Sequence, residues 1–173
     1  MAVLLTLAPA HAEDKTEATH GKIAVVDKQY LVANSKAGKS IRSQLEAKRN
    51  AYRKEIEKQE AELNKLGKDL KDQQTSLSKE EFMKRYKVLD EKAKKGQMAV
   101  FEHTKAFEKA YVESLGVLDG HIGKIVADIA GKNNIALVLN RQEVVLVEAK
   151  MDLTKQVLAE LDKKVSSIPV NIK

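Results

Sequence analysis

The sequence predicts an α+β protein that is mostly α, in which one long antiparallel helical hairpin projects from a small β-type body. Between Gly38 and Lys132, apolar residues recur at steps of three, four or seven, which is typical of the narrow seam between two paired helices. The pattern breaks once, at residues 73–78. Charged residues make up 32% of the chain and aromatic residues only 4%, a balance that favours an extended helical protein over a compact globule.

The first arm of the hairpin is predicted to start near Ser35 or Gly38 and to end at about Asp72. Its apolar residues fall on two heptad lines, and Lys, Glu, Arg and Gln fill most of the other positions. At the rise of an α-helix, an arm of about 35 residues reaches roughly 50 Å. The apolar residues of this arm and of the turn after it are Leu45, Tyr52, Ile56, Leu63, Leu66, Leu70 and Leu77.

The second arm is predicted to start at Ser78, which forms a capping-box pattern with Glu81 three residues later. Because the connection before it is short, the two arms should lie side by side and antiparallel. Glycines inside this arm each cost about 1 kcal/mol relative to alanine, so the arm is expected to be able to bend, either as a kinked or as a soft helix. A Gly-Lys-Asn-Asn stretch at residues 131–134 suits a left-handed cap. The glycines are Gly96, Gly116, Gly120 and Gly123, and the predicted seam residues are Phe82, Tyr86, Leu89, Ala93, Val100, Phe107, Tyr111, Val117, Leu118, Ile122, Ile125 and Ile129.

Short β-type segments flank the hairpin. Residues 22–27 precede it, and residues 135–139 and 144–147 follow it as a predicted strand pair around a four-residue loop. Asp152 is expected to cap a last helix. These strands are too few for an independent core, and exposed strand edges pair readily with other chains. We therefore expect an oligomer whose strands join across subunits. The chain ends on an alternating apolar tail of Ile168, Val170 and Ile172.

The first twelve residues have the pattern of the back half of a secretory signal peptide. A short apolar run at residues 2–8 is followed by Pro-Ala-His-Ala, which contains an A-x-A cleavage pattern, and then by polar residues. The basic region that normally precedes the apolar run is missing, and the run is too short to span a bilayer. The mature chain is expected to begin near Glu13 and to be exported. A frayed, mildly apolar N-terminus is the alternative interpretation.

The residues do not suggest catalysis. The chain has no cysteine, which excludes disulfides and thiol chemistry. His103 and His121 lack partners three or four positions away, so we expect no zinc site. No pair of carboxylates is placed for acid–base work, and no glycine-rich phosphate loop follows a strand. We therefore expect a protein that is not an enzyme and that uses no cofactor.

The basic residues concentrate near the predicted tip of the hairpin. The chain has a formal net charge of +6, which favours acidic partners. Residues 65–95 contain ten basic and six acidic residues, so this segment carries an excess of four positive charges. This surface either keeps the arm soluble or contacts acidic clients or anionic lipid headgroups. We expect no nucleic-acid binding, because Phe82 and Tyr86 are predicted to lie on the seam and not to stack on bases. The ten residues are Lys65, Lys68, Lys71, Lys79, Lys84, Arg85, Lys87, Lys92, Lys94 and Lys95.

The order of these parts resembles the Skp (OmpH) family of periplasmic chaperones over essentially the whole mature chain. The resemblance rests on the signal-like start, the strand Lys22–Asp27, Lys39-Ser40 at the entry to the charged hairpin, the two later β-type segments and Asp152-Leu153-Thr154 before the last helix. It implies a homotrimer in which strands of three subunits build the β-body and three hairpins surround a central cavity. It further implies an ATP-independent holdase for unfolded outer-membrane proteins, with lipopolysaccharide contact in some members.

With this resemblance the chain divides into four parts. They are a residual signal peptide (1–12), a disordered segment (13–21), a β-rich trimerisation body (22–37 and 133–173) and a coiled-coil-like hairpin (38–132). The residues expected to build the trimer body are Ile23, Val25, Ile135, Leu137, Leu139, Val145 and Val147. Two alternatives remain open from the sequence. One is a structural coiled-coil spacer that tethers envelope layers without binding unfolded chains, and the other is a basic coiled coil that binds nucleic acid.

Overall fold

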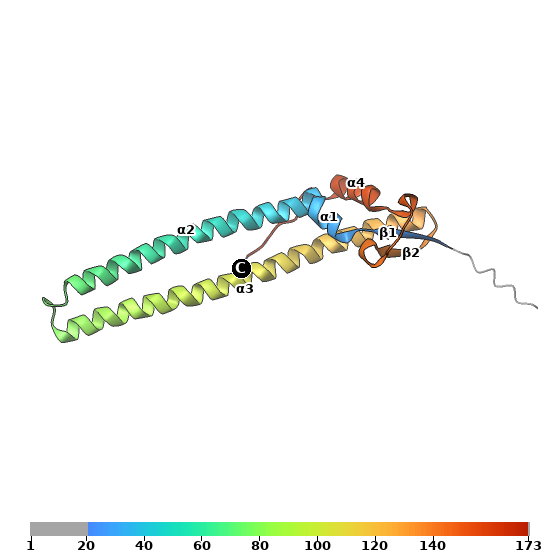
Figure 1. Cartoon of the computed structure of the whole chain (residues 1–173). Coiled ribbons are helices and arrows are strands. Elements are labelled where there is room, and N and C mark those ends of the chain that lie inside the picture. Colours follow the sequence, from blue (N-terminus) through green and yellow to red (C-terminus); the bar gives the residue numbers. More distant parts are fainter. Residues whose placement is uncertain (1–20, 173) are drawn as a thin grey trace, which may run out of the picture.

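The computed structural model describes residues 21–172 and shows a long helical hairpin attached to a small body (Figure 1). The predicted signal peptide and residues 13–20 lie outside the described residues. The fold class and the hairpin are confirmed. In chain order the elements are β1 (Lys22–Val26), α1 (Lys28–Asn34), α2 (Lys36–Asp72), α3 (Lys79–Lys132), β2 (Ile135–Asn140), two short 3-10 turns (Arg141–Glu143 and Ala149–Met151) and α4 (Thr154–Lys164).

A polar side chain caps the N-terminus of each of the first three helices. Asp27 Oδ1 accepts the Tyr30 N–H at 2.8 Å, and Ser35 Oγ accepts the Gly38 N–H at 3.1 Å. Ser78 Oγ accepts the Glu81 N–H at 3.2 Å, which confirms the predicted start of the second arm. Each bond satisfies one of the amide donors that a helix N-terminus leaves unpaired. The short α1 therefore ends at the residue that caps α2.

Gly38 is required by this close succession of helices. A Cβ atom at this position would lie 1.9 Å from the carbonyl oxygen of Val32 in α1. No real Cβ atom approaches a backbone oxygen so closely, so any larger residue would push α1 and α2 apart. The glycine lets the first turn of α2 pack directly against the helix that precedes it.

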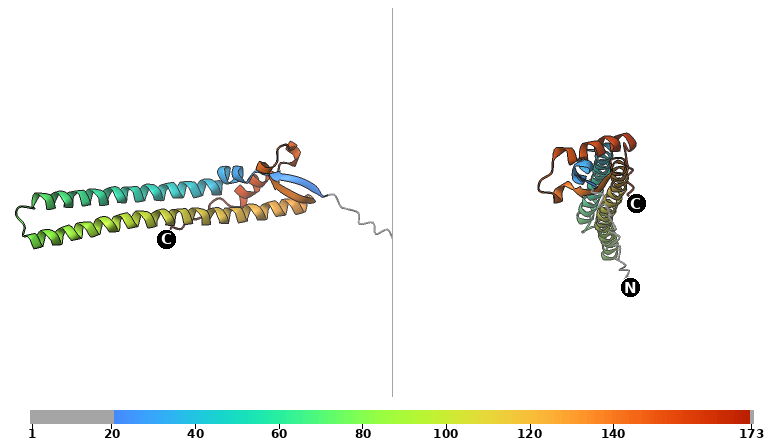
Figure 2. Two further views of the ribbon diagram at one scale, coloured as in Figure 1. Left: turned by 60° about the horizontal axis from the view of Figure 1, so that its bottom comes forward. Right: turned by 90° about the vertical axis from the view of Figure 1, so that its right-hand side faces the viewer.

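The second arm, α3, is one continuous helix of 54 residues that runs through the four glycines named above and through Gly131. It ends at Lys132, and Asn134 takes the left-handed backbone conformation, with φ of 54°. The predicted left-handed cap is therefore confirmed at an asparagine, whereas Gly131 stays helical. Figure 2 shows that α3 follows α2 along the whole hairpin.

The β-part differs from the prediction. β1 and β2 pair in parallel, with the entire hairpin as the crossover between them. The predicted strand pair of residues 135–139 and 144–147 is wrong, and the described chain forms a two-stranded sheet. After β2, residues 141–143 coil into a 3-10 turn in which Arg141 Nη1 donates to the Val144 carbonyl at 2.8 Å. This turn leads the chain away from β2, so residues 144–147 do not return along it.

On its other side, β1 is covered by the segment before α4. The Leu153 N–H donates to the Val25 carbonyl at 2.9 Å, and Asp152 forms an isolated bridge with Val25. Leu153, and not Asp152 as predicted, occupies the cap position of α4, and Asp152 Oδ1 accepts the N–H of Thr154, the first residue of this helix, at 2.9 Å. β1 is therefore paired on both sides, and the outer edge of β2 is open within the described chain.

The core lies where the hairpin meets the body. Leu31 of α1, Ile41 of α2, Leu118 of α3 and Leu161 of α4 are each at most 1% exposed and belong to one buried cluster. Four helices thus contribute to a single apolar centre. The seam continues along the arms but is narrower than predicted. Phe107, Ile122, Ile125 and Ile129 are buried, whereas Tyr86, Val100, Tyr111 and Val117 are each more than 40% exposed.

Candidate functional site

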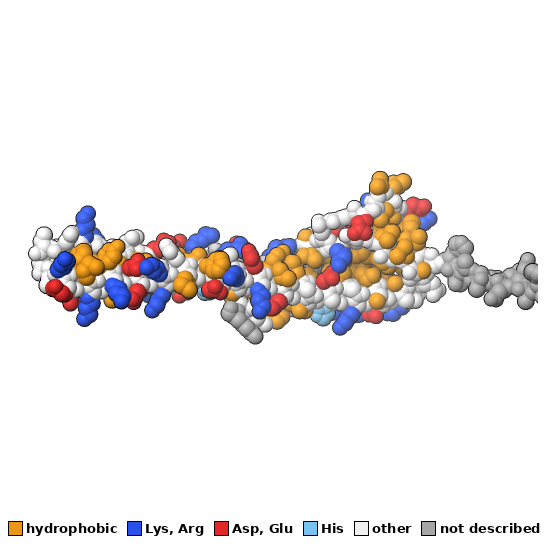
Figure 3. All heavy atoms as spheres, turned by 90° about the horizontal axis from the view of Figure 1, so that it is seen from below, with side chains coloured by type: hydrophobic (Ala, Val, Ile, Leu, Met, Phe, Trp, Pro, Cys, Tyr) orange, Lys and Arg blue, Asp and Glu red, His pale blue; other side chains and the backbone are white. Residues whose placement is uncertain are grey.

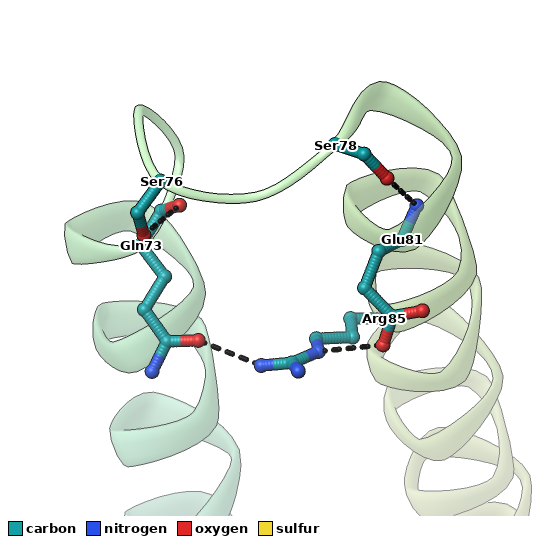
Figure 4. A network of polar contacts seen from close by, with 5 residues as sticks. All are labelled: Gln73, Ser76, Ser78, Glu81 and Arg85. Atoms are coloured by element: carbon teal, nitrogen blue, oxygen red, sulfur yellow. Dashed lines mark hydrogen bonds and ion pairs between the residues drawn. The ribbon is translucent and has the colours of Figure 1, made fainter.

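The tip of the hairpin is closed by a polar network that joins the two arms (Figure 4). Arg85 of α3 donates from Nη1 to Gln73 Oε1 at 2.6 Å and from Nε to Glu81 Oε1 at 3.1 Å. Ser76 Oγ donates to the Gln73 carbonyl at 3.1 Å. The Glu81 carboxylate therefore binds Arg85, and of the predicted capping box the structure shows the bond from the Glu81 N–H to Ser78. Arg85 connects the end of α2 to the start of α3.

A groove of about 330 Å³ lies between the arms just below this network. Leu66 and Leu70 of α2 and Val88 and Leu89 of α3 give it apolar walls. Charged residues of both signs surround these walls, namely Asp69, Glu81, Lys84, Arg85 and Lys92. The groove can therefore hold an apolar side chain while the charges stay in water.

All ten basic residues predicted near the tip are exposed. Three belong to α2 and seven to α3, and they surround both arms instead of converging on one point. Arg85 is paired with Glu81, and Lys94 Nζ is 2.7 Å from Asp90 Oδ2. The hydrogen bond to Asp90 raises the pKa of Lys94 above its usual value. Exposed pairs of this kind stabilise little, so the ten residues act mainly as a diffuse positive field.

Sequence reasoning missed the most distinctive surface of the hairpin, which is a stripe of exposed apolar side chains on α3. Met83, Met98, Phe101 and Val112 are each between 55% and 68% exposed. They follow one another at steps of 15, 3 and 11 residues, and such steps keep them on one side of a helix with 3.6 residues per turn. In α2, by contrast, one large apolar side chain among the described residues is exposed, namely Leu66 at 41%. The apolar pattern of α3 predicted one buried seam, and these four residues lie outside the predicted seam.

The α3 stripe is mixed with charge. The ammonium group of Lys105 lies 4.2 Å from the centre of the Phe101 ring, which is a cation–π contact. Figure 3 shows hydrophobic atoms along the arms as small separate patches among charged side chains, and a broader hydrophobic region over the body. A long surface of this type offers many small contacts instead of one deep pocket.

Midway along the hairpin, aromatic rings fill the seam. The rings of Tyr52 and His103 stack at 3.7 Å, and Phe107 lies 6.2 Å from His103. The Tyr52 hydroxyl and His103 Nδ1 are shielded from solvent and have no hydrogen-bond partner within the described chain. Burial, and secondarily the Glu55 carboxylate, raises the pKa of Tyr52 above its usual value. This stack replaces the leucine contacts used nearer the tip.

The body presents a second apolar surface on β2 and on the loop that follows it. Val145 and Leu146 are 101% and 88% exposed, and Leu137 of β2 is 47% exposed. Of the other residues expected to build a trimer body, Ile23 and Leu139 are exposed, whereas Ile135 and Val147 are half-buried. Val25 is 1% exposed and lies inside the chain's own fold. Six of the seven predicted residues therefore keep apolar surface in solvent within the described chain.

Two specific searches found nothing in the part of the chain that the structure describes. No three His, Asp or Glu side chains within residues 21–172 gather closely enough to hold a metal ion. None of the helices in this range combines the length and apolar character that are needed to cross a bilayer. The functional candidates that the described residues offer are the α3 stripe, the basic tip and the apolar surface of the body.

Comparison with known proteins agrees with this architecture. The family model described as OmpH, outer membrane protein (OmpH-like), matches residues 22–161. The crystal structure of an OmpH-like protein from Caulobacter crescentus CB15, described as a candidate outer membrane chaperone, matches with a TM-score of 0.84. That match has 18% sequence identity and covers 100% of this chain and 97% of the other, so it shows the same fold. No curated protein matches the chain. Because the family model spans most of its length, the chain belongs to the OmpH-like family of outer membrane proteins.

Proposed function

We propose that this protein is an ATP-independent holdase chaperone of the periplasm, which binds unfolded outer-membrane proteins and keeps them from aggregating. Membership of the OmpH-like family and the shared fold with a candidate outer membrane chaperone support the chaperone class. The α3 stripe is the observation that carries the proposal. It offers exposed apolar side chains along a helix that has no interior of its own. The protein acts by binding and not by catalysis.

The chemistry of the stripe suits a client without a fixed shape. Methionine side chains are flexible and polarisable, so they adapt to many apolar partners. Met83 and Met98 are 55% and 68% exposed, and the neighbouring charges keep the arm soluble when no client is bound. The excess of positive charge near the tip attracts clients with net negative charge and speeds their capture. Contacts with anionic lipid or lipopolysaccharide would use the same basic residues.

A cavity for the client requires several hairpins, and the body offers the means to assemble them. The open edge of β2 leaves backbone groups free for pairing with another chain. Val145 and Leu146 expose apolar surface on the loop after β2, and burial against a neighbouring subunit would remove it from water. We propose a homotrimer with three hairpins around a shared space. Light scattering should give three times the mass of the mature chain. The double variant Val145→Asp with Leu146→Asp should have the mass of a single chain.

The test of the holdase function compares the two arms. Met98→Ser with Phe101→Ser removes the centre of the α3 stripe, and Lys54→Ser with Lys58→Ser is a matched pair of exposed positions on α2. A denatured outer-membrane β-barrel protein is diluted into buffer, and its aggregation is followed by turbidity. The wild type and the α2 variant should suppress aggregation at one trimer per client. The α3 variant should need several times more protein. Equal suppression by both variants would rule out the stripe as the client surface, and failure of the wild type would rule out the holdase.

A further inference from the structure

The last residues of the described chain lie along the root of the hairpin after α4 has ended. Figures 1 and 2 show residues 165–172 as an extended trace that leaves the body and runs beside the arms. Their burial alternates. Ile168 and Val170 are each 3% exposed, and Pro169 and Asn171 between and after them are exposed. Side chains that alternate with a period of two mark an extended, strand-like segment.

Gln44 of α2 binds the backbone of this tail as a neighbouring strand would. Its Nε2 donates to the Ile168 carbonyl at 2.8 Å, and its Oε1 accepts the Val170 N–H at 3.1 Å. Nε2 also donates to Ser40 Oγ at 2.9 Å, and that hydroxyl lies 2.8 Å from Ser167 Oγ. One amide side chain therefore satisfies a donor and an acceptor two residues apart. The two bonds to Ile168 and Val170 use backbone groups, so they do not depend on which side chains these residues carry.

The apolar contacts are equally general. Ile168 and Val170 join the buried cluster of Ile41 and Leu118 at the meeting point of α2, α3 and α4. Ile172 is half-buried against the same cluster. The site thus requires two or three apolar side chains at every second position, with solvent-exposed residues such as Pro169 and Asn171 between them. Any extended chain with this alternation can present the same groups.

We propose that this groove at the root of the hairpin is a binding site for extended chain segments with alternating apolar residues, and that the C-terminal tail is its resident, displaceable occupant. Naming unfolded outer-membrane proteins as the incoming ligand rests on the proposed function. The strands of such barrels place apolar side chains at every second position, as Ile168, Val170 and Ile172 do in the tail. A short tether gives the tail an effective concentration on the order of millimolar, so it excludes weak ligands and yields to clients that bind at several points.

The test uses full-length chains and a fluorescent peptide of residues 166–173 as the probe. Val170→Asp should unseat the tail, because it places a carboxylate in a buried apolar socket. Asn171→Asp is the matched control at the exposed neighbouring position. By fluorescence anisotropy, the Val170→Asp chain should bind the peptide at least tenfold more tightly than the wild type or the Asn171→Asp chain. Adding Gln44→Leu should remove this gain. A peptide of the same composition with its three apolar residues adjacent should not bind.

Either of two results would overturn the proposal. One is a folded Val170→Asp chain that binds the peptide no better than the wild type, and the other is a gain that survives Gln44→Leu or is shared by the rearranged peptide. If Val170→Asp unfolds the chain, hydrogen exchange on the wild type decides instead. The Val170 amide should lose at least tenfold of its protection when a denatured barrel protein is bound, and unchanged protection contradicts the idea. The turbidity assay distinguishes this proposal from the holdase function. If the wild type suppresses aggregation but its tail stays bound, the holdase function is supported and the tail site is contradicted.

Discussion

The root and the outer part of the hairpin are built from the same two helices, but they are held together in different ways. At the root, Ile41 of α2 and Leu118 and Ile122 of α3 are at most 1% exposed, because α1, α4 and the tail cover them. Towards the tip, Leu70 is the buried apolar residue of α2, at 8%, and grooves open between the arms. When two helices pack only against each other, each covers one side of its partner and the remaining surface of both stays in water. We therefore expect stability to be concentrated at the root, where the apolar residues are covered.

The largest expected difference between these regions comes from matched leucine truncations. Leu118→Ala at the root should lower the free energy of unfolding by about 2–5 kcal/mol, because it leaves a cavity in a fully covered cluster. Leu66→Ala in the outer arm, where the side chain is 41% exposed, should cost less than about 1 kcal/mol. Denaturant titration followed by circular dichroism measures both. Equal losses would mean that the arm is packed as tightly as the root.

A glycine pair should sharpen the same comparison at the level of the backbone. Gly38→Ala should destabilise the protein by about 1–3 kcal/mol, because its Cβ would collide with the Val32 carbonyl oxygen and force α1 away from α2. Gly116→Ala in α3 places its Cβ in open space and should be neutral or stabilising by up to about 1 kcal/mol. Thermal melts of both variants provide the measurement. A stable Gly38→Ala protein would show that the contact between α1 and α2 yields easily.

Gly96→Ala tests whether softness of the outer arm is used. Nothing lies within 4 Å of a Cβ at Gly96, which lines a groove between the arms, so alanine should stabilise α3 by about 1 kcal/mol. If client binding needs a flexible arm, this more stable variant should suppress aggregation less well than the wild type. Hydrogen exchange along α3 together with the turbidity assay would show both effects. A stiffer arm with unchanged suppression would separate flexibility from function.

The smallest expected effect concerns the aromatic stack at the boundary of the two regions. Tyr52→Phe keeps the ring on His103 and removes a shielded hydroxyl without a partner, so stability at pH 7 should change by less than about 1 kcal/mol. The pKa of Tyr52 is raised in the folded chain, so the folded state holds this proton more tightly than the unfolded state does. The resulting stability is present below pH 10 and is lost as the pH rises through the folded pKa. Melts at pH 8 to 11 should show a shallower alkaline decline in the variant.

Local signals in the sequence predicted the helical part of the fold well. Ser78 caps α3, α2 ends at Asp72, and Asn134 takes the left-handed conformation after α3. Each of these features depends on a few neighbouring residues, so the pattern is readable without the rest of the chain. The exposure of the ten basic residues near the tip was also predictable, because charged side chains stay in water. Whether they bind a client stays a prediction.

Long-range contacts account for the errors. Residues 144–147 have strand-like side chains, but the hydrogen bonds of β2 go to β1, which lies on the far side of the hairpin in the chain. Tyr86 and Val100 fit the heptad pattern yet lie exposed, since a period of 3.6 in a straight helix drifts away from a seam of 3.5. The α3 stripe was not recognised, because only the packing of α2 against α3 decides which apolar residues stay exposed. The alternating tail was recognised but its binding site was not, because Gln44 lies far from it in the chain.

By itself, the sequence determined where the helices begin and end, that they form a hairpin, and that its outer surface is charged. These properties follow from capping, periodicity and side-chain polarity, which act over a few residues. Only the tertiary structure decided which apolar residues are covered, that β1 pairs in parallel with β2, and that Gln44 binds the tail across 124 residues of chain to the Ile168 carbonyl. Such choices compare the free energies of whole arrangements, and a contact between distant residues leaves no mark on the sequence around either one.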